Sequence, residues 1–407
     1  MRILFITHYF QPEPNFFSGL PFAKELIRRG HEVQVLTGFP NYPGGRIYPG
    51  YKVRMLQRET LEGVPVMRVP VYPSHDRSSA RRMLCYTSFG LSAATIGPWI
   101  VKDADVAYVS QGPVTVGLPA CALRLLRRIP FVLHIQDLWP DTLESTGMFN
   151  SRTGMSLVHA ACRFMYRRAG KIVVIAPGMK CRLIDRGVPE KKIELIYNWC
   201  DDALICRNPR DEKLAGDLGM TGRFNIVFAG NMGKAQALDP VLDAAAIVAQ
   251  QAPEVQFIFI GSGVDTDDLK ARSVKMGLNN VLFIPRRPIS EIGSMLDLAD
   301  VLLVHLRNDP LFRITIPSKI QAYMAAGRPI LIAVPGDASD LVQKAGAGIT
   351  CEPENAADIA AQVLKLAAMP RSELEQMGRR GAQYYNHELS FAVAVSRLEQ
   401  VFSQAAT

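Results

Sequence analysis

Residues 1–37, MRILFITHYFQPEPNFFSGLPFAKELIRRGHEVQVLT, decide the fold class of this chain. The run Arg2–Thr7 is short and apolar, which is typical of a buried strand. Phe22–Arg29 has a helical pattern and stops at Gly30, the residue type that most often follows a helix end. Glu32–Thr37 is a second strand. The stretch therefore predicts a strand–helix–strand unit with two parallel strands.

The same alternation runs along the whole chain and starts again after a polar stretch at 198–222, where we expect a linker. Strands that alternate with helices indicate parallel sheets covered by helices on both faces. We predict two Rossmann-like, doubly wound α/β domains at 1–200 and 201–385, facing each other across a cleft, and a C-terminal helix within 386–407 that crosses back to the first domain. The further predicted strands are Val64–Val71, Val106–Ser110, Phe131–Ile135, Lys171–Ile175, Ile193–Ile196, Phe224–Phe228, Val255–Ile260, Val281–Ile284, Val301–Val304 and Pro329–Ala333, with a helix at Asp239–Gln250.

The composition is that of a globular protein with a basic first half. Of the 407 residues 48% are hydrophobic and 21% charged, which excludes an intrinsically disordered chain. Residues 1–200 carry 26 Lys and Arg against 14 Asp and Glu, whereas residues 201–407 carry 20 against 24. The first half therefore favours an anionic partner, and nucleic acid and an acidic membrane surface both fit this charge.

Two features bear on the cellular compartment. The seven cysteines form no C-x-x-C pair and no zinc-like cluster, so we interpret them as reduced thiols of a cytoplasmic protein. The 19 residues Met83–Val101 carry no charge and follow three arginines. Because they include several Ser, Thr and Gly residues and a proline, they predict a buried or membrane-interfacial helix rather than a membrane span.

Polar groups in the first half lie where strands end. Gly19 precedes the first helix, so its backbone could approach a phosphate, although an ordinary turn is the better explanation of a single glycine. His134 and Gln136 share one side of a strand, and Asp137 follows at its carboxyl end. We predict that these three orient the reacting groups; for His134, a buried core histidine is an equal alternative.

Two segments of the second half suggest a site for a diphosphate. The loop Gly230–Lys234 follows a strand and combines two glycines with a lysine, which suits close approach of a diphosphate. Ser318 is a candidate helix cap, and Lys319 in the first helical turn opposes the helix dipole, which indicates an anion there. The acidic clusters are better explained by surface loops and helix starts, so no metal site is predicted.

These segments resemble glycosyltransferase family 4, which has the GT-B fold, and the resemblance covers essentially the whole chain. The stretches that carry it are Gly30–Val33 with Val35–Thr37, Gln136–Pro140, Pro317–Lys319 and Tyr323–Ile330. They are most similar to the bacterial O-antigen and capsule branch, including transferases of fucosamine-type sugars.

The resemblance implies a retaining transferase that uses a nucleotide sugar, expected to be UDP-linked, and needs no metal or other cofactor. The acceptor would be a lipid-linked sugar or a saccharide, bound by the first domain at the inner face of the cytoplasmic membrane; nucleic acid is not an expected partner. By position, the donor would contact Gly19, Gly230, Asn231, Lys234, Gln236, Arg287, Arg313, Ile314, Thr315, Ile316, Ser318 and Lys319.

This chain departs from the family pattern at several of these positions. Ile314 and Ala322 stand where most members have glutamates, and Asn231 and Gln236 stand where an arginine and a lysine are usual. Gln136 replaces a common histidine. We expect Lys234 and Lys319 to supply the missing positive charge.

Two other function classes remain open from the sequence. Nucleotide-sugar 2-epimerases share this architecture and need no acceptor. A nucleotide-binding protein that has lost catalysis is the third alternative, because the usual glutamates are absent.

Overall fold

The computed structural model describes residues 1–407 except 16, 76–77, 146–151, 207 and 407. The chain divides into two compact units, which are Met1–Tyr197 with Val395–Thr407, and Asn198–Ala394. The sequence predicts the first boundary at 200/201 and the terminal segment at 386–407. The division lies at 197/198 and 394/395 instead, and the last 13 residues belong to the first unit.

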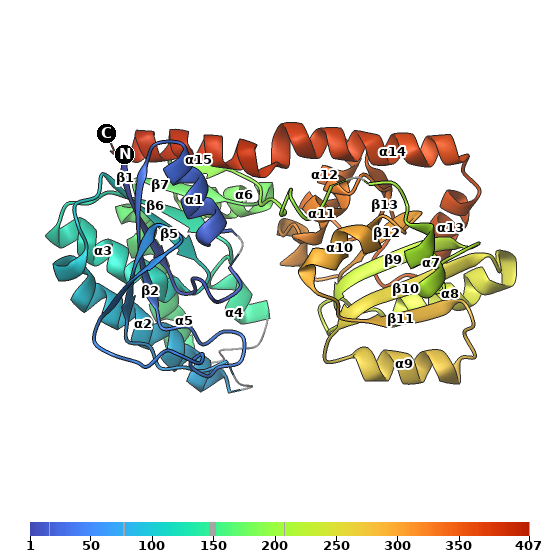
Figure 1. The fold of residues 1–407 in the computed structure, drawn as a ribbon, viewed down its shortest axis with the longest axis horizontal. Coiled ribbons are helices and arrows are strands. Elements are labelled where there is room, and N and C mark those ends of the chain that lie inside the picture. The colour runs from blue at the N-terminus through green and yellow to red at the C-terminus, as the bar shows by residue number, and fades with distance from the viewer. Residues whose placement is uncertain (16, 76–77, 146–151, 207, 407) are drawn as a thin grey trace. The chain divides into compact units, whose positions relative to one another are not determined.

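The first unit is built on an eight-stranded sheet in the order β3-β4-β2-β1-β5-β6-β7-β8. All neighbouring strands are parallel except β3 and β4. The central strands are parallel because helical crossovers join them, and both of their faces are buried (Figure 1). The strands are β1 (Arg2–Thr7), β2 (Glu32–Gly38), β3 (Gln57–Leu61), β4 (Val64–Val69), β5 (Val106–Gln111), β6 (Phe131–Ile135), β7 (Lys171–Val174) and β8 (Ile193–Leu195).

Helices cover both faces of this sheet. Strand order reverses at β1, so right-handed crossovers place α1 on one face and α2, α3 and α5 on the other. The first helix buries Leu20, Phe22 and Leu26, and Gly30 follows it with a φ of 89°. The helices of this unit are α1 (Leu20–Arg28), α2 (Ser79–Ile100), α3 (Gly117–Leu126), α4 (Asp141–Ser145), α5 (Arg152–Arg168), α6 (Pro177–Asp185) and most of α15 (Phe391–Ala406), with short 3-10 turns at Val114–Val116 and Glu190–Lys192.

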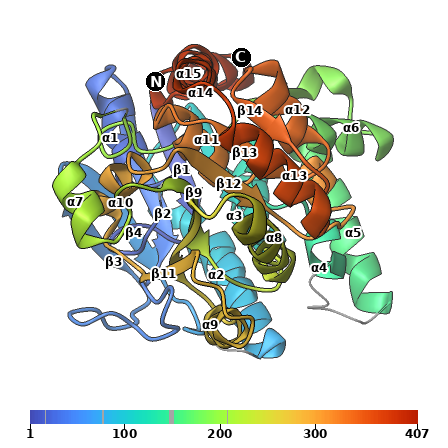
Figure 2. The same ribbon diagram turned by 90° about the vertical axis from the view of Figure 1, so that its right-hand side faces the viewer.

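The second unit repeats the plan with a six-stranded parallel sheet in the order β11-β10-β9-β12-β13-β14. Figure 2 shows α8 and α13 on one side of it and α10 and α11 on the other. The strands are β9 (Phe224–Asn231), β10 (Val255–Ser262), β11 (Val281–Pro285), β12 (Val301–His305), β13 (Ile330–Ala333) and β14 (Gly348–Thr350). The helices are α7 (Glu212–Asp217), α8 (Asp239–Gln251), α9 (Thr266–Lys275), α10 (Ile289–Leu296), α11 (Lys319–Ala325), α12 (Asp337–Lys344), α13 (Ala356–Ala367) and α14 (Arg371–Tyr384), with a 3-10 turn at Phe312–Ile314 and a π-helical turn at Tyr385–Leu389.

The prediction of two doubly wound α/β domains is confirmed, and each predicted strand is present. The sequence missed the short strands β3 and β14, and β9 continues three residues beyond its predicted end at Phe228. The uncharged stretch Met83–Val101 falls within α2 and the residue after it. Within the described part of the chain, no helix combines the length and apolar character needed to cross a membrane.

Candidate functional site

In each unit the carboxyl ends of the strands carry the candidate site. Open parallel sheets bind their ligands at this edge, because loops and helix starts converge there. In the first unit, the loop after β1 is held by Glu13, whose buried carboxylate accepts the backbone N–H groups of Phe10, Asn41 and Tyr42 at 3.2, 2.7 and 2.8 Å. Burial raises the Glu13 pKa to about 7. Glu13 therefore joins the loops that follow β1 and β2.

Gly19 stands at the start of α1 because no side chain fits there. A Cβ at this position would lie 1.8 Å from the carbonyl oxygen of Asn15. The next N–H group, that of Leu20, already donates to Gln11 Oε1 at 2.7 Å. Close packing of the loop thus explains the glycine, and its contact with a phosphate stays a prediction.

His8 is a residue of this edge that sequence analysis did not select. It follows β1 directly, is 3% exposed, and places Nε2 3.5 Å from Cys85 Sγ of α2. Among the described residues its Nδ1 has no hydrogen-bond partner. Burial lowers the His8 pKa to about 3, so the ring is neutral. A histidine immediately after an apolar strand was the signal that could have identified it.

Asp137 lies at the mouth of the same edge, as predicted. Its side chain is exposed, and Oδ2 lies 3.6 Å from the position of a Cβ on Gly112, the residue after β5. Protein atoms nevertheless surround the carboxyl group, so loss of hydration raises its pKa. The Asp137 charge in turn contributes to the raised pKa of Tyr86 on α2. Asp137 can therefore accept a hydrogen bond from a ligand at this edge.

His134 lies beneath the edge and does not reach it. The side chain is fully buried, with Nδ1 2.6 Å from Tyr108 Oη and Nε2 3.1 Å from Gln136 Nε2. Burial lowers its pKa to about 3, and the neutral ring accepts from the Gln136 amide while Nδ1–H donates to Tyr108. His134 is therefore a buried core histidine, which is one of the two alternatives predicted. The other prediction, that it contacts the reacting groups, is wrong in this structure. Gln136 is half-buried and orients the histidine.

In the second unit, a cavity of about 330 Å³ opens at the carboxyl ends of β9, β10 and β11. The Gly230 loop and the two arginines that follow β11 line this cavity together. Gly230, Asn231 and Arg287 were each predicted to contact the donor. Gly230 and Gly261 both have backbone angles that favour glycine, with φ of 141° and 139°. The lining residues are Gly230, Asn231, Ile260, Gly261, Ser262, Arg286, Arg287, Ile289 and Ile292.

Gln236 closes the Gly230 loop on itself. Its Oε1 accepts from Asn231 Nδ2 at 3.1 Å and from the Gly233 N–H at 3.2 Å. Gln236 and Asn231 are thus placed together, and each contributes to the shape of the loop.

Lys234 does not point into the cavity where it was predicted to contact a diphosphate. The side chain is 79% exposed, and Nζ forms an ion pair with Asp265 at 2.6 Å, which raises its pKa. Lys234 does not line the cavity. An anion at the Gly230 loop would have to compete with Asp265 for this lysine.

Lys319 is the unusual cation of this edge. Nζ is buried, lies 3.6 Å from the centre of the Phe228 ring, and has no hydrogen-bond partner among the described residues. A Cβ at Gly230 would be 3.2 Å from this nitrogen, so the missing side chain of Gly230 gives the amine its place. Burial lowers the Lys319 pKa to about 7. The amine therefore lies directly beneath a residue that lines the cavity.

The segment before α11 is placed by its own backbone contacts. Arg313 and Ile314 lie in a 3-10 turn, Thr315 Oγ1 donates to the Leu311 carbonyl at 2.8 Å, and Ile316 is buried. Ser318 is exposed and stands at the N-cap position of α11, as predicted, but its side chain makes no cap hydrogen bond. None of these residues lines the cavity.

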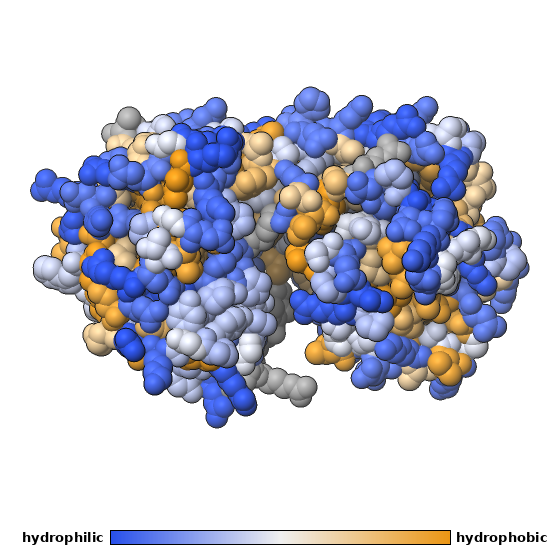
Figure 3. Space-filling view, in the orientation of Figure 1, coloured by the Kyte–Doolittle hydropathy of each residue, from blue (hydrophilic) through white to orange (hydrophobic). Residues whose placement is uncertain are grey.

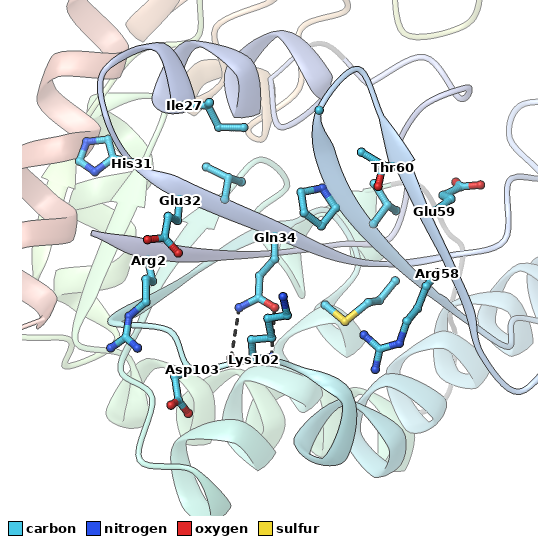
Figure 4. Close-up of a pocket in the computed structure, with 15 residues that line it drawn as sticks. Arg2, Ile27, His31, Glu32, Gln34, Arg58, Glu59, Thr60, Lys102 and Asp103 are labelled. Atoms are coloured by element: carbon cyan, nitrogen blue, oxygen red, sulfur yellow. Dashed lines mark hydrogen bonds between the residues drawn. The ribbon is translucent and has the colours of Figure 1, made fainter.

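No group of three or more His, Cys, Asp or Glu side chains suited to a metal ion occurs among the residues that the structure covers. A larger hollow, about 720 Å³, lies in the first unit at the amino ends of β1 and β2 (Figure 4). There the Gln34 side chain exchanges two hydrogen bonds of 3.1 Å with the backbone of Lys102. Because this is the opposite edge from the one that binds ligands in such sheets, we assign no substrate to it.

Comparisons with known proteins agree with this architecture. Residues 20–199 match the family described as glycosyl transferase 4-like domain, and residues 223–369 match glycosyl transferases group 1. Together the two matches cover most of both units.

The relatives with similar sequences include bacterial glycosyltransferases. The chain is 25% identical over 287 residues to the probable glycosyltransferase WbjE of Pseudomonas aeruginosa, covering 68% of this chain and 71% of WbjE. It is 25% identical over 361 residues to WcaI of Escherichia coli K12, a putative colanic acid biosynthesis glycosyl transferase, covering 85% and 86%. The crystal structure of Anabaena HepE with UDP and glucose has the same fold, with a TM-score of 0.68, 17% identity, and coverage of 98% of this chain and 99% of HepE. The chain is therefore a glycosyltransferase with the GT-B fold.

Proposed function

We propose that this enzyme transfers a sugar, with retention of configuration, from a UDP-linked donor to a lipid-linked or saccharide acceptor in bacterial surface polysaccharide biosynthesis. The observation that carries the proposal is the cavity at the Gly230 loop, which two glycines and two arginines line at a sheet edge and beneath which a buried amine lies. UDP bound in the HepE structure supports the donor, and the similarity to WcaI, a putative colanic acid biosynthesis glycosyl transferase, supports the process.

The main requirement of the reaction is to stabilise the leaving group. The bond between the sugar C1 and the diphosphate oxygen breaks while the acceptor oxygen bonds to C1, and the acceptor hydroxyl proton passes last to the departing diphosphate. Negative charge therefore grows on the nucleoside diphosphate. Arg286, Arg287 and a protonated Lys319 are the cations at or beneath the cavity that would stabilise it. With these cations in place we propose that no metal ion is required.

Asp137 is the residue we propose for orienting the acceptor. Its carboxylate stands at the carboxyl edge of β6 beside Gly112, where a glycine leaves room for a substrate. A hydrogen bond from the acceptor hydroxyl to this group would fix the attacking oxygen, which is a positioning effect. The sugar we propose is a deoxy- or acetamido-sugar such as N-acetylfucosamine, on the resemblance to that branch. The enzyme would act as a peripheral protein at the inner face of the cytoplasmic membrane.

Thermal unfolding in the presence of UDP, GDP, ADP or NAD, each with and without magnesium, tests the donor class. A ligand that binds only the folded protein raises its apparent stability. We expect UDP to raise the melting temperature equally with and without magnesium. Stabilisation by NAD, or by none of the four, would refute the proposed donor.

The transfer itself is tested by incubating UDP-linked sugars with and without saccharide acceptors and following the products. We expect UDP release that depends on an acceptor and a product that keeps the anomeric configuration of the donor. An isomerised UDP-sugar formed without acceptor would instead identify a 2-epimerase.

A further inference from the structure

The helix α2 has apolar residues on both of its sides, and only one side is covered by residues of the first unit that the structure describes. Its inner side buries Cys85, Phe89 and Ala93. Its outer side exposes Leu84 (49%), Leu91 (55%) and Trp99 (83%). These three residues lie within one arc of the helix, because spacings of seven and eight residues correspond to about two turns.

The neighbouring helix α3 extends this exposed apolar surface. α2 packs against α3, and Arg127 Nη1, one residue beyond α3, donates to the Pro98 carbonyl of α2 at 2.7 Å. This bond brings the carboxyl ends of the two helices together. Leu125 (69% exposed) and Leu126 (60%) therefore lie at the same end of the layer as Trp99. We call Leu84, Leu91, Trp99, Leu125 and Leu126 the α2–α3 face, and Figure 3 shows apolar atoms gathered among polar ones over these helices.

The charge around this face is mainly positive. Residues 78–130 contain six Lys or Arg and two Asp. Asp103 is ion-paired with Arg127, and Asp105 with Arg2, so neither opposes the remaining cations. Arg81, Lys102, Arg124 and Arg128 are exposed. Contiguous exposed apolar groups mark interaction surfaces, and a basic margin selects an anionic partner.

We propose that the α2–α3 face docks the enzyme onto an anionic lipid bilayer. Trp99 and the leucines would enter the interfacial region while the arginines contact lipid phosphates, as in other interfacial helices. A second copy of this chain fits less well, because a two-fold contact would bring the same cations face to face.

Docking by this face would bring its Leu84 end next to the candidate acceptor edge. Cys85, next to the outward Leu84, contacts His8 at the carboxyl end of β1. The 22-residue helix, about 33 Å long, thus borders the acceptor edge with its first turns and presents its outer side to lipid. The α2–α3 face would be the surface that meets the membrane holding a lipid-linked acceptor. Only this link to the acceptor rests on the proposed function.

Vesicle flotation of the full-length protein tests the proposal. We expect binding to phosphatidylcholine vesicles that contain phosphatidylglycerol, weaker binding at high salt, and little binding to phosphatidylcholine alone. The double variant Trp99→Ser with Leu125→Ser should bind the anionic vesicles about tenfold more weakly or worse. The matched control is Val264→Ser with Val274→Ser, two residues of the second unit that are 76% and 81% exposed, which should bind like the unaltered protein.

Three outcomes would overturn the proposal: unaltered vesicle binding by the Trp99/Leu125 variant, equal binding to neutral and anionic vesicles, or a dimer in light scattering that this variant abolishes. The melting temperature of each variant establishes that it is folded, and its shift with UDP measures donor binding separately. A protein that binds vesicles but not UDP would contradict the proposed function and leave the docking face intact.

Discussion

The Lys319 ammonium lies 3.6 Å from the centre of the Phe228 ring and has no oxygen acceptor among the described residues. A buried amine without an acceptor is costly, and cation–π contact offsets only part of the lost hydration. The arrangement becomes favourable when an anion approaches from the Gly230 side. Lys319 therefore contributes more to a ligand complex than to the empty protein.

Replacing Lys319 by Met should weaken UDP-sugar binding about 10- to 100-fold, from the roughly 1.5–3 kcal/mol of a hydrogen bond to a charged group. Titration calorimetry measures the dissociation constant. Lys234→Met is the matched control, because that lysine is exposed and already paired with Asp265. Its loss should be at most about fivefold, the range of an exposed ion pair. Equal losses in the two variants would contradict this division of roles.

The affinity for a UDP-sugar should fall as the pH rises above about 7. Burial lowers the Lys319 pKa to about 7 in the empty protein, and an adjacent diphosphate raises it. Below that pH the amine is already charged; above it, binding must take up a proton. Burial, and to a smaller degree the neighbouring Lys319, lowers the His305 pKa and so moves the titration of His305 away from this range. The diphosphate of a UDP-sugar has no group that titrates there, so a pH slope that persists in Lys319→Met would disprove the assignment.

Gly230→Ala should impair both stability and binding. Its φ of 141° is a conformation for glycine, and a side chain there costs about 1–3 kcal/mol. The new Cβ would also lie 3.2 Å from Lys319 Nζ and displace it. Gly219→Ala is the control, since that glycine has a φ of 70° and open space around it. Both variants should lose stability in urea denaturation, but only Gly230→Ala should lose UDP-sugar affinity.

Asp137→Asn should abolish most turnover, by about 100-fold or more, while donor affinity is unchanged because Asp137 belongs to the first unit. Burial raises the Asp137 pKa, so the active carboxylate forms as the pH rises, and turnover should rise with it. The variant should lose this part of the pH profile. Asp141→Asn is the control: that carboxylate is ion-paired with Arg182 and Arg186, so its loss should lower stability and spare turnover. Full activity of Asp137→Asn would show that Asp137 has no role in the reaction.

The fold could be predicted because its strands are buried on both faces and therefore apolar throughout. β3 escaped prediction because it is an antiparallel strand at the sheet edge with the polar sequence Gln-Arg-Glu-Thr-Leu. β14 was not predicted because its three residues are too few to show the alternation of a strand. Local pattern decides a sheet's interior, whereas an edge strand forms through pairing with its neighbour.

The candidate site was only partly predictable, since its side chains are arranged by residues far along the chain. The ion pair of Lys234 with Asp265 redirects a lysine that local sequence assigns to a phosphate. Ser318 makes no cap bond because its backbone is itself helical, with φ of −59° and ψ of −19°, and capping needs an extended residue. The buried amine of Lys319 depends on Phe228, in a strand that the sequence does not connect to it.

Tyr108→Phe distinguishes a structural from a catalytic role of His134. The Tyr108 hydroxyl is the partner of His134 Nδ1 at 2.6 Å, and its removal leaves a buried donor without an acceptor. We expect a loss of about 1–3 kcal/mol in the free energy of unfolding, measured by urea denaturation. Tyr72→Phe, at a position that is 42% exposed, should cost nothing measurable. At temperatures where Tyr108→Phe is folded, its kcat/KM should equal that of the unaltered enzyme, because His134 does not reach the sheet edge. A fall in kcat/KM without a loss of stability would instead return His134 to the reaction.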